Sequence, residues 1–517
     1  MSTIESSAAA GAPAAASGDG TGRLHRRSLG VPDLVFFIVA ASAPLTAVAG
    51  GQAATYLVTG NRGIPFLFIP LGIILSVFAV GYAAMSRHVA DAGAFYTYVV
   101  RGLGKIPGVG VAFVALISYN AMQVGIYGLF GVAFGAFMSD KIGITLDWYW
   151  WCLIAGAIIA VLGVLQIDLN ARILAILLIC EVLVVAIFDF AVVANPGPEG
   201  LTTVGFHPSV ATESALGAAL TFCVAAFVGF ESAAIYSEEA KDPKKTVARA
   251  TFIAIGLIAV FYALSSWLLA DAIGPKTMIN PDALVKAGFT DVTGQAPDPT
   301  TVLVGSGTDR LGAFWGDCAS LLFATSLFAA LLSFHNSVAR YAFALGRERV
   351  FPAAFGRVSR RTGAPVVGSV AQSILALVVV GVFAITNQDP VLKLFTWLTN
   401  LGALGVLLLM AVTSFAVFAF FTKRPDPQLG VWRTKIAPAL AGVALLVVLV
   451  LGVSNFNVLI TSTIGAPTDS MTVILQVILF GGGVVGLIVG YVMKRTRPEA
   501  YAMIGERTPT EEAEAVA

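Results

Sequence analysis

Long apolar segments separated by short polar connections dominate this sequence. A helix needs about 20 apolar residues to cross the hydrocarbon core of a bilayer, whereas barrel strands alternate over about 9–11 residues. The twelve segments that meet the helical requirement are 33–59, 65–86, 106–138, 149–167, 173–194, 214–237, 248–271, 312–342, 366–386, 390–422, 436–456 and 473–493. The pattern predicts an all-α membrane protein with about 12 transmembrane helices.

Composition and charge agree with this prediction and add an orientation. The 517 residues are 57% hydrophobic and 12% charged, and the net charge of +1 gives no indication of nucleic-acid binding. If the N-terminus is cytoplasmic, 25 of the 31 Lys and Arg residues fall in the tails and in the inner loops. Cytoplasmic loops are enriched in Lys and Arg, so we expect a multi-pass protein of the cell membrane with both termini in the cytoplasm.

The ends of the chain are too polar and too simple in composition to pack. We expect residues 1–30 to form a disordered cytoplasmic tail, residues 31–495 to form the transmembrane domain, and residues 496–517 to form a cytoplasmic C-terminal tail. The basic stretch 23–27 leads into a full-length apolar segment, so the first segment is expected to act as the insertion signal rather than as a cleaved signal peptide.

Motifs of metal sites and of the common enzyme classes are lacking. The four Cys residues fall inside predicted helices without paired spacing, and the four His residues have no ligand-like spacing. The chain has no Walker loop, no His-Glu-x-x-His and no Gly-x-Ser-x-Gly turn. We therefore expect no metal, no cofactor and no enzymatic activity.

Two of the apolar segments are interrupted at corresponding places. Pro44 lies within ASAPLTA at 41–47 in the first segment, and Gly229 lies within FVGFES at 227–232 in the sixth. An interrupted membrane helix leaves backbone groups unpaired, which is tolerated only where protein, water or a ligand satisfies them. Paired breaks are typical of a transporter binding site, although Pro44 alone is also compatible with a simple kink.

The order of the segments is compatible with an inverted repeat. If the first segment runs outward, the sixth runs inward, and long connections follow the second and seventh segments on opposite sides. We expect a five-plus-five arrangement with broken helices 1 and 6, a first repeat over about 31–195, a second over about 213–422, and two additional helices over 436–493.

The geometry of such breaks suits a zwitterion. Amides at a helix N-terminus favour a carboxylate, and helix carbonyl ends favour an ammonium group. The first break therefore predicts an amino-acid site at Ser42, Ala43, Pro44, Leu45, Thr46 and Ala47. The hydroxyls of Ser42 and Thr46 are equally compatible with bonds to neighbouring carbonyls.

Several stretches resemble the amino acid-polyamine-organocation permeases. The most specific is FVGFES at 227–232 followed by EEAKDPKK at 238–245, and AGAFY at 92–96, RGLG at 101–104, RYAFA at 340–344 and FP at 351–352 support it. The resemblance covers about residues 30 to 495. It implies the inverted-repeat transporter fold and amino acids or related amines as substrates.

The chain also departs from that family in two places. Many members carry a Gly-rich first break, whereas Pro44 here removes one amide donor. Some relatives place a Lys in the fifth helix, where its charge substitutes for a sodium ion, and this chain has Glu181 near that position.

The two acidic residues near the middle of the membrane are candidates for coupling or gating. A carboxylate at the bilayer centre is costly, so Glu181 is expected to carry a proton, to stay protonated in a structural role, or to anchor sodium. The resemblance implies a part in pH-dependent gating for Glu231, for which capping of a half-helix is the alternative.

Other residues stranded in apolar segments complete the predicted site. In the third segment Asn120 and Gln123 share a helix face, so they are expected to bind substrate or to bond between helices. Phe227 and Phe230 flank the second break and are expected to close over the substrate or to pack, and Gly229 within the break is expected to bind substrate. Thr325 and Ser326 in the eighth segment could coordinate a cation or serve helix packing.

These observations predict a secondary active transporter, with proton-coupled import of a neutral or apolar amino acid by alternating access. An amino-acid exchanger, a polyamine or organic-amine permease, and a membrane amino-acid sensor without transport are the alternatives. Gly482, Gly486 and Gly490 form a smooth ridge, which is compatible with a homodimer contact or with packing inside the chain.

Overall fold

The computed structural model describes residues 30–89, 94–165, 171–231, 243–291, 294–359 and 361–505. The predicted tails at 1–29 and 506–517, and the motif residues 92–93 and 238–242, lie outside the described residues.

The described chain is helical, as the apolar pattern predicts. Eleven helices are long and apolar enough to cross a membrane, and the sixth predicted segment appears as the shorter apolar helix α9. The helices of this group are α1 (Val31–Ala41) continued by η1 (Thr46–Gln52) and α2 (Ala53–Thr59), α3 (Ile64–Ser86), α5 (Lys105–Ile142), α6 (Trp148–Leu165), α7 (Ala171–Ala194), α9 (Leu216–Phe227), α11 (Pro243–Ile273), α15 (Ala313–Arg347), α16 (Val366–Ile385), η4 (Pro390–Phe395) with α17 (Thr396–Lys423), η5 (Trp432–Ile436) with α18 (Ala437–Thr461), and α19 (Ser470–Thr496).

Shorter elements lie in the connections. They are α4 (Ala94–Leu103), η2 (Val204–Phe206), α8 (Pro208–Glu213), α12 (Pro275–Met278), α13 (Pro281–Lys286), α14 (Thr301–Leu311) and α20 (Pro498–Met503). The long stretch after the seventh predicted segment thus contains the short helices α12, α13 and α14.

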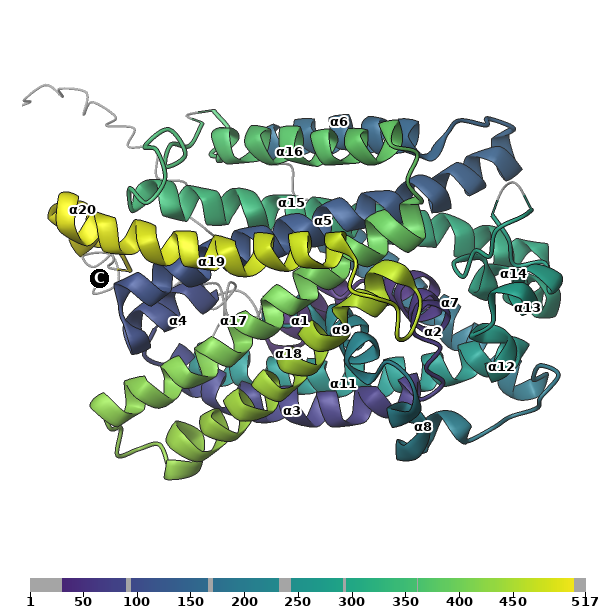
Figure 1. Ribbon diagram of the computed structural model, residues 1–517, viewed down its shortest axis with the longest axis horizontal. Coiled ribbons are helices and arrows are strands. Elements are labelled where there is room, and N and C mark those ends of the chain that lie inside the picture. Colours follow the sequence, from purple (N-terminus) through teal and green to yellow (C-terminus); the bar gives the residue numbers. More distant parts are fainter. Residues whose placement is uncertain are drawn as a thin grey trace, which may run out of the picture.

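The packing of the helices follows the five-plus-five inverted repeat. A pseudo-two-fold axis relates each helix to the one five places later, so the helices nearest the axis contact their own counterparts. The second predicted helix, α3, packs along the seventh, α11; α5 packs along α15; and α6 packs along α16 (Figure 1). The broken helices α1 and α9 lie between these pairs.

The glycine ridge formed by Gly482, Gly486 and Gly490 on α19 packs inside the chain. A Cβ atom added to Gly486 would come within 2.8 Å of the Gly110 Cα, and one added to Gly490 would lie 3.2 Å from the Ile106 Cα. The ridge therefore allows α19 to approach α5 closely, which is the intrachain packing alternative. A homodimer stays a prediction.

Both predicted breaks are present. In the first, Ala43 has the left-handed angle φ of +45°, and the chain resumes a helix at Pro44. Proline suits this position, because the first residues of a helix have no intrahelical partner for their amides. In the second, α9 ends at Phe227 and Gly229 has φ of +113°. The two breaks adjoin, since a Cβ atom on Gly229 would lie 2.8 Å from the Ala41 Cβ.

Candidate functional site

A cavity lies where the broken first helix meets the end of α9. The space between atoms there, including space open to solvent, is about 620 Å³. None of the described residues that line it is charged. Its apolar walls come from α3, α5, α9, α15 and η4 and include Ile64, Phe68, Met122, Ile126, Phe222, Phe334 and Phe395.

The first break contributes four of its six predicted site residues to the cavity wall. Ser42, Ala43, Thr46 and Ala47 line the cavity. Pro44 and Leu45 are buried at the start of the outer half-helix and are not among the lining residues. Substrate contact by any of the six stays a prediction.

The inner half of the first helix is fixed at its end by a tyrosine of α11. The Tyr262 hydroxyl lies 3.1 Å from both the carbonyl oxygen and the hydroxyl oxygen of Ser42, and the Ser42 hydroxyl donates to the Val39 carbonyl at 2.8 Å. The Tyr262 ring also packs on Phe68, with centroids 5.6 Å apart. The carbonyl end of α1 therefore has a defined position at the cavity.

The outer half of the first helix is connected to Glu181. The Thr46 hydroxyl donates to the Ser326 hydroxyl at 3.0 Å, and Ser326 donates to the Glu181 carboxyl at 2.8 Å. Glu181 on α7 is 5% exposed, so one buried acid joins the start of the half-helix to two other membrane helices.

Glu231 fulfils a similar role at the second break. Its two carboxyl oxygens accept from the Tyr119 hydroxyl at 2.8 Å and from the Gly229 backbone amide at 2.9 Å. The Tyr82 hydroxyl lies 3.3 Å from the Glu231 carbonyl oxygen. Glu231 is 2% exposed. The bonds from Tyr119 on α5 and Tyr82 on α3 hold the turn after α9 against these two helices.

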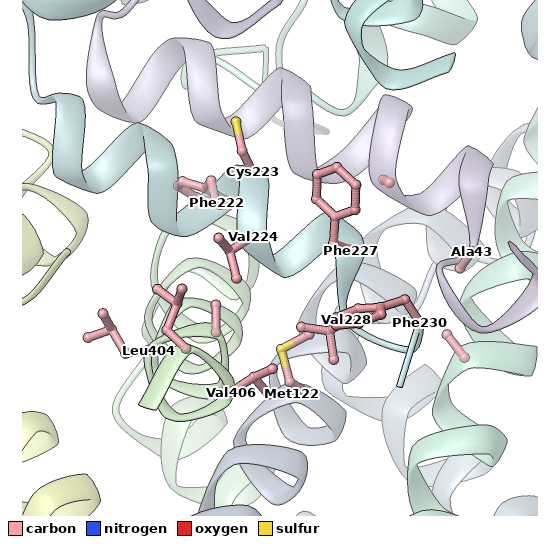
Figure 2. Close-up of a cluster of buried hydrophobic side chains, with 14 of the residues drawn as sticks. Ala43, Met122, Phe222, Cys223, Val224, Phe227, Val228, Phe230, Leu404 and Val406 are labelled. Carbon is pink, nitrogen blue, oxygen red and sulfur yellow. The ribbon is translucent and has the colours of Figure 1, made fainter. Parts of the chain in front are cut away.

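The aromatic residues that flank the second break are packed behind the cavity wall. Figure 2 shows the end of α9 opposite Ala43, with Phe227 and Phe230 on either side of Val228. The Phe227 ring contacts Phe68 at 5.9 Å between centroids, and Phe230 contacts Phe78 at 5.9 Å edge to face. Val228 lines the cavity, whereas Phe227, Gly229 and Phe230 are not among the lining residues.

The polar residues predicted on the third helix make contacts away from the cavity. The Asn120 side-chain amide donates to the Leu116 carbonyl at 2.6 Å. Gln123 accepts from the Gln372 amide, and its own amide nitrogen lies 3.4 Å from the His335 ring nitrogen Nδ1. Neither Asn120 nor Gln123 lines the cavity. The Gln123 contacts join α5, α15 and α16.

The neighbouring residues Thr325 and Ser326 on α15 differ in their hydrogen-bond partners. Thr325 donates to the Leu322 carbonyl within its own helix at 3.0 Å. Only Ser326 reaches across to another helix, and it does so towards Glu181. The structure therefore brings Thr46, Glu181 and Ser326 together and leaves Thr325 apart from them.

Three polar residues of the cavity wall were not predicted from the sequence. They are Gln52 in η1, Thr55 in α2 and Thr399 in α17, and Gln52 and Thr399 are the two without a hydrogen-bond partner among the described residues. Gln52 is a polar residue within an otherwise apolar stretch of the first segment, which is the signal that indicated Asn120 and Gln123 in the third. Thr399 lies beside Asn400 in a similar context, so the same criterion could have found both.

Comparison with known proteins gives a consistent family. The family model described as amino acid permease matches residues 29–483. Cationic amino acid transporter 7, chloroplastic, of Arabidopsis thaliana is 25% identical over 402 residues, which cover 72% of this chain and 61% of that protein.

Two bacterial relatives are similar over more of their own length. The low-affinity putrescine importer PlaP of Escherichia coli (strain K12) is 22% identical over 77% of this chain and 82% of that protein. The branched-chain amino acid permease BcaP of Lactococcus lactis subsp. cremoris (strain MG1363) is 22% identical over 71% of this chain and 76% of that protein. These relatives are named for different substrates. Together the names indicate amino acids or amines as the class of transported molecule.

Proposed function

Because this chain belongs to the amino acid permease family, we propose that it is a secondary transporter that imports a neutral amino acid with protons by alternating access. The observation that carries the proposal is the uncharged cavity at the junction of two broken helices. The excess of basic residues in alternate loops supports a cell-membrane location with cytoplasmic termini.

The backbone around the cavity supplies both kinds of group that the main chain of an amino acid needs. Ala41 at the carbonyl end of α1 and Ala225 and Ala226 at the carbonyl end of α9 line the cavity. Helix carbonyl ends carry partial negative charge and favour an ammonium group. The Thr46 amide lies at the start of the outer half-helix, where a backbone amide favours the carboxylate.

The lining favours a neutral side chain over a cationic one. Burying an ammonium or guanidinium group without a partner of opposite charge is strongly unfavourable. The acids nearest the breaks, Glu181 and Glu231, are engaged with hydroxyl and amide donors and do not line the cavity. Import of a diamine, suggested by the name of the putrescine importer, is the alternative and would require one of these acids to turn into the cavity.

Coupling to protons is assigned to Glu181. When ionised, its carboxylate accepts from Ser326, whose hydroxyl accepts from Thr46, and this chain of bonds holds the outer half of the first helix against α7 and α15. When protonated, it gains a donor and loses acceptor strength, so this connection weakens. Protonation therefore biases the position of the half-helix that lines the substrate cavity, which is the requirement for coupled movement.

Uptake by purified protein in proteoliposomes tests the proposal. We expect saturable accumulation of a neutral amino acid when an inward proton gradient is imposed, and no such accumulation with a sodium gradient alone. Glu181→Gln keeps the size of the side chain but cannot ionise, so it is expected to exchange substrate across the membrane without accumulating it. The matched control is Glu213→Gln on the surface, where Glu213 pairs with Arg62 at 3.4 Å.

The outcomes separate the parts of the proposal. Full proton-driven accumulation by Glu181→Gln would exclude this residue as the coupling group. Absence of saturable uptake for every amino acid and amine tested would exclude transport itself, and binding without flux would favour a sensor.

A further inference from the structure

The cavity wall contains polar residues besides those at the helix breaks. Gln52 and Thr399 are two of them, and they are 2% and 5% exposed. Neither the side-chain nitrogen nor the oxygen of Gln52 has a hydrogen-bond partner among the described residues, and the same holds for the Thr399 hydroxyl. A buried polar group without a partner is costly, so three such atoms in one cavity wall require an explanation.

Other hydroxyls of the same wall are satisfied within the protein. Thr55 donates to the Gly51 carbonyl at 2.7 Å, and Thr46 donates to Ser326 at 3.0 Å. Bonds from a helical hydroxyl to a preceding carbonyl are the usual arrangement in apolar surroundings. Thr399 is a helical hydroxyl of the same kind that does not make this bond. Its free hydroxyl is thus a local exception within this wall.

Both residues are associated with π-helical turns. Gln52 is the last residue of the π-helix η1, and Thr399 follows the π-helix η4 by one turn. Such turns occur often at functional sites, because they displace side chains from the regular helical face. Here one turn lies on the first predicted helix and the other on the tenth, and both reach the same cavity.

The rest of the cavity wall is largely apolar and includes Met122 and Phe222.

We propose that Gln52 and Thr399 form a recognition pair for the end of the substrate side chain, and that the substrate is a neutral amino acid whose side chain ends in a carboxamide. The inference rests on the proposed function. A glutamine amide and a hydroxyl offer both donors and acceptors but no charge, so they match a group that both donates and accepts. An aliphatic side chain would leave all three atoms unpaired in the bound state.

Pairs of substrates with similar shape test the assignment. Labelled glutamine is compared with methionine, and asparagine with leucine, by their kcat/KM for uptake into proteoliposomes. The parent protein is expected to favour the carboxamide member of at least one pair by on the order of tenfold, the equivalent of ~1.4 kcal/mol. Gln52→Leu and Thr399→Val are each expected to lower that ratio to about one.

Thr55→Val is the matched control for Thr399→Val. It removes a hydroxyl from the same cavity wall, but one that already donates to Gly51. Its ratio of glutamine to methionine is expected to equal that of the parent, whatever happens to the overall rate. If Gln52→Leu does not fold, the comparison of the two threonine variants decides the question.

The failure of this inference differs from failure of transport. If kcat/KM for methionine and leucine equals that for glutamine and asparagine, the recognition pair is overturned. The transporter proposal is then left intact. Unchanged ratios in both Gln52→Leu and Thr399→Val would also overturn it. The absence of uptake for all four substrates, with uptake of a cationic amino acid or a diamine, would overturn the neutral-substrate proposal on which the pair rests.

Discussion

Gly229 at the second break provides a direct test of how the two broken helices meet. Its φ of +113° lies well outside the regions that residues with a Cβ atom occupy. A Cβ atom there would lie 2.8 Å from the Ala41 Cβ and 3.1 Å from the Ala41 carbonyl carbon. Since one of these contacts is with backbone, Gly229→Ala requires the end of α1 to move.

The loss of stability expected for Gly229→Ala follows from the backbone strain and from the close contact with Ala41. Forcing an alanine into a sparsely populated backbone region costs on the order of 1–3 kcal/mol. Overpacking against a neighbouring chain costs about 1–3 kcal/mol more. We therefore expect Gly229→Ala to lower the free energy of unfolding by roughly 2–6 kcal/mol, a large fraction of the stability of most proteins.

The effect on transport is expected to exceed the effect on folding. The Gly229 amide donates to the Glu231 carboxyl at 2.9 Å, and the shift of Ala41 changes the carbonyl end that lines the cavity. Surviving folded protein should therefore take up substrate more slowly than the parent. Thermal unfolding of the purified protein in detergent measures stability, and uptake per folded molecule measures the second effect.

Gly256→Ala is the control for the same chemical change. Gly256 lies within α11, and an added Cβ atom would meet no atom within 4 Å. Alanine is favoured over glycine inside a helix by about 1 kcal/mol, so this variant should be as stable as the parent or more so. If Gly229→Ala matched Gly256→Ala in both melting temperature and uptake, the close contact of the two breaks would be refuted.

Three further predictions concern the breaks and the loop that contains Asp298. Ala43→Gly is expected to raise the melting temperature by relieving roughly 1–2 kcal/mol of strain at φ of +45°, and a lower melting temperature would contradict that strain. Tyr119→Phe leaves one Glu231 oxygen without its donor and is expected to cost about 1–3 kcal/mol, measured by thermal unfolding, while an unchanged melting temperature would contradict the role of this bond. Burial raises the pKa of Asp298, which lies outside the membrane-spanning helices, from 3.8 to about 6 despite bonds from Thr300, so the folded state holds the proton more tightly. Its contribution to stability is therefore expected to fall as the pH rises from about 4 to 6, and hydrogen exchange in the loop should show this dependence in the parent and not in Asp298→Asn.

The apolar pattern predicted the fold because a membrane imposes strict requirements on the backbone. Helix length follows from bilayer thickness, and an interruption must be satisfied locally, so the breaks at Pro44 and Gly229 could be located from the sequence. In the sixth segment α9 ends at Phe227, at the predicted break, and residues 232–237 of that segment lie outside the described residues. A hydropathy pattern detects apolar residues and not the conformation of the residues between them.

The side chains of the site were harder to predict, because a polar residue in a membrane helix has several ways to be satisfied. Asn120 and Gln123 share the face that the spacing indicated, yet Asn120 bonds within its own helix and Gln123 faces α15 and α16. Thr325 and Ser326 are adjacent, and only Ser326 reaches Glu181. Spacing identifies the face of a helix, but the partner on that face depends on the tertiary packing.

The π-helical turns explain why the sequence did not predict Gln52 and Thr399 as residues of the cavity wall. A regular helix has 3.6 residues per turn, and predictions of a shared face assume this period throughout. Seven residues of η1 depart from it, so Gln52 does not lie where the spacing from Ser42 and Thr46 would place it. The same holds for Thr399 after η4. Both π-helical turns lie at the cavity, so an assumed period of 3.6 residues gives the wrong helix face for Gln52 and Thr399. A polar residue in an apolar stretch is therefore a better indicator of this site than the position of that residue in the helical period.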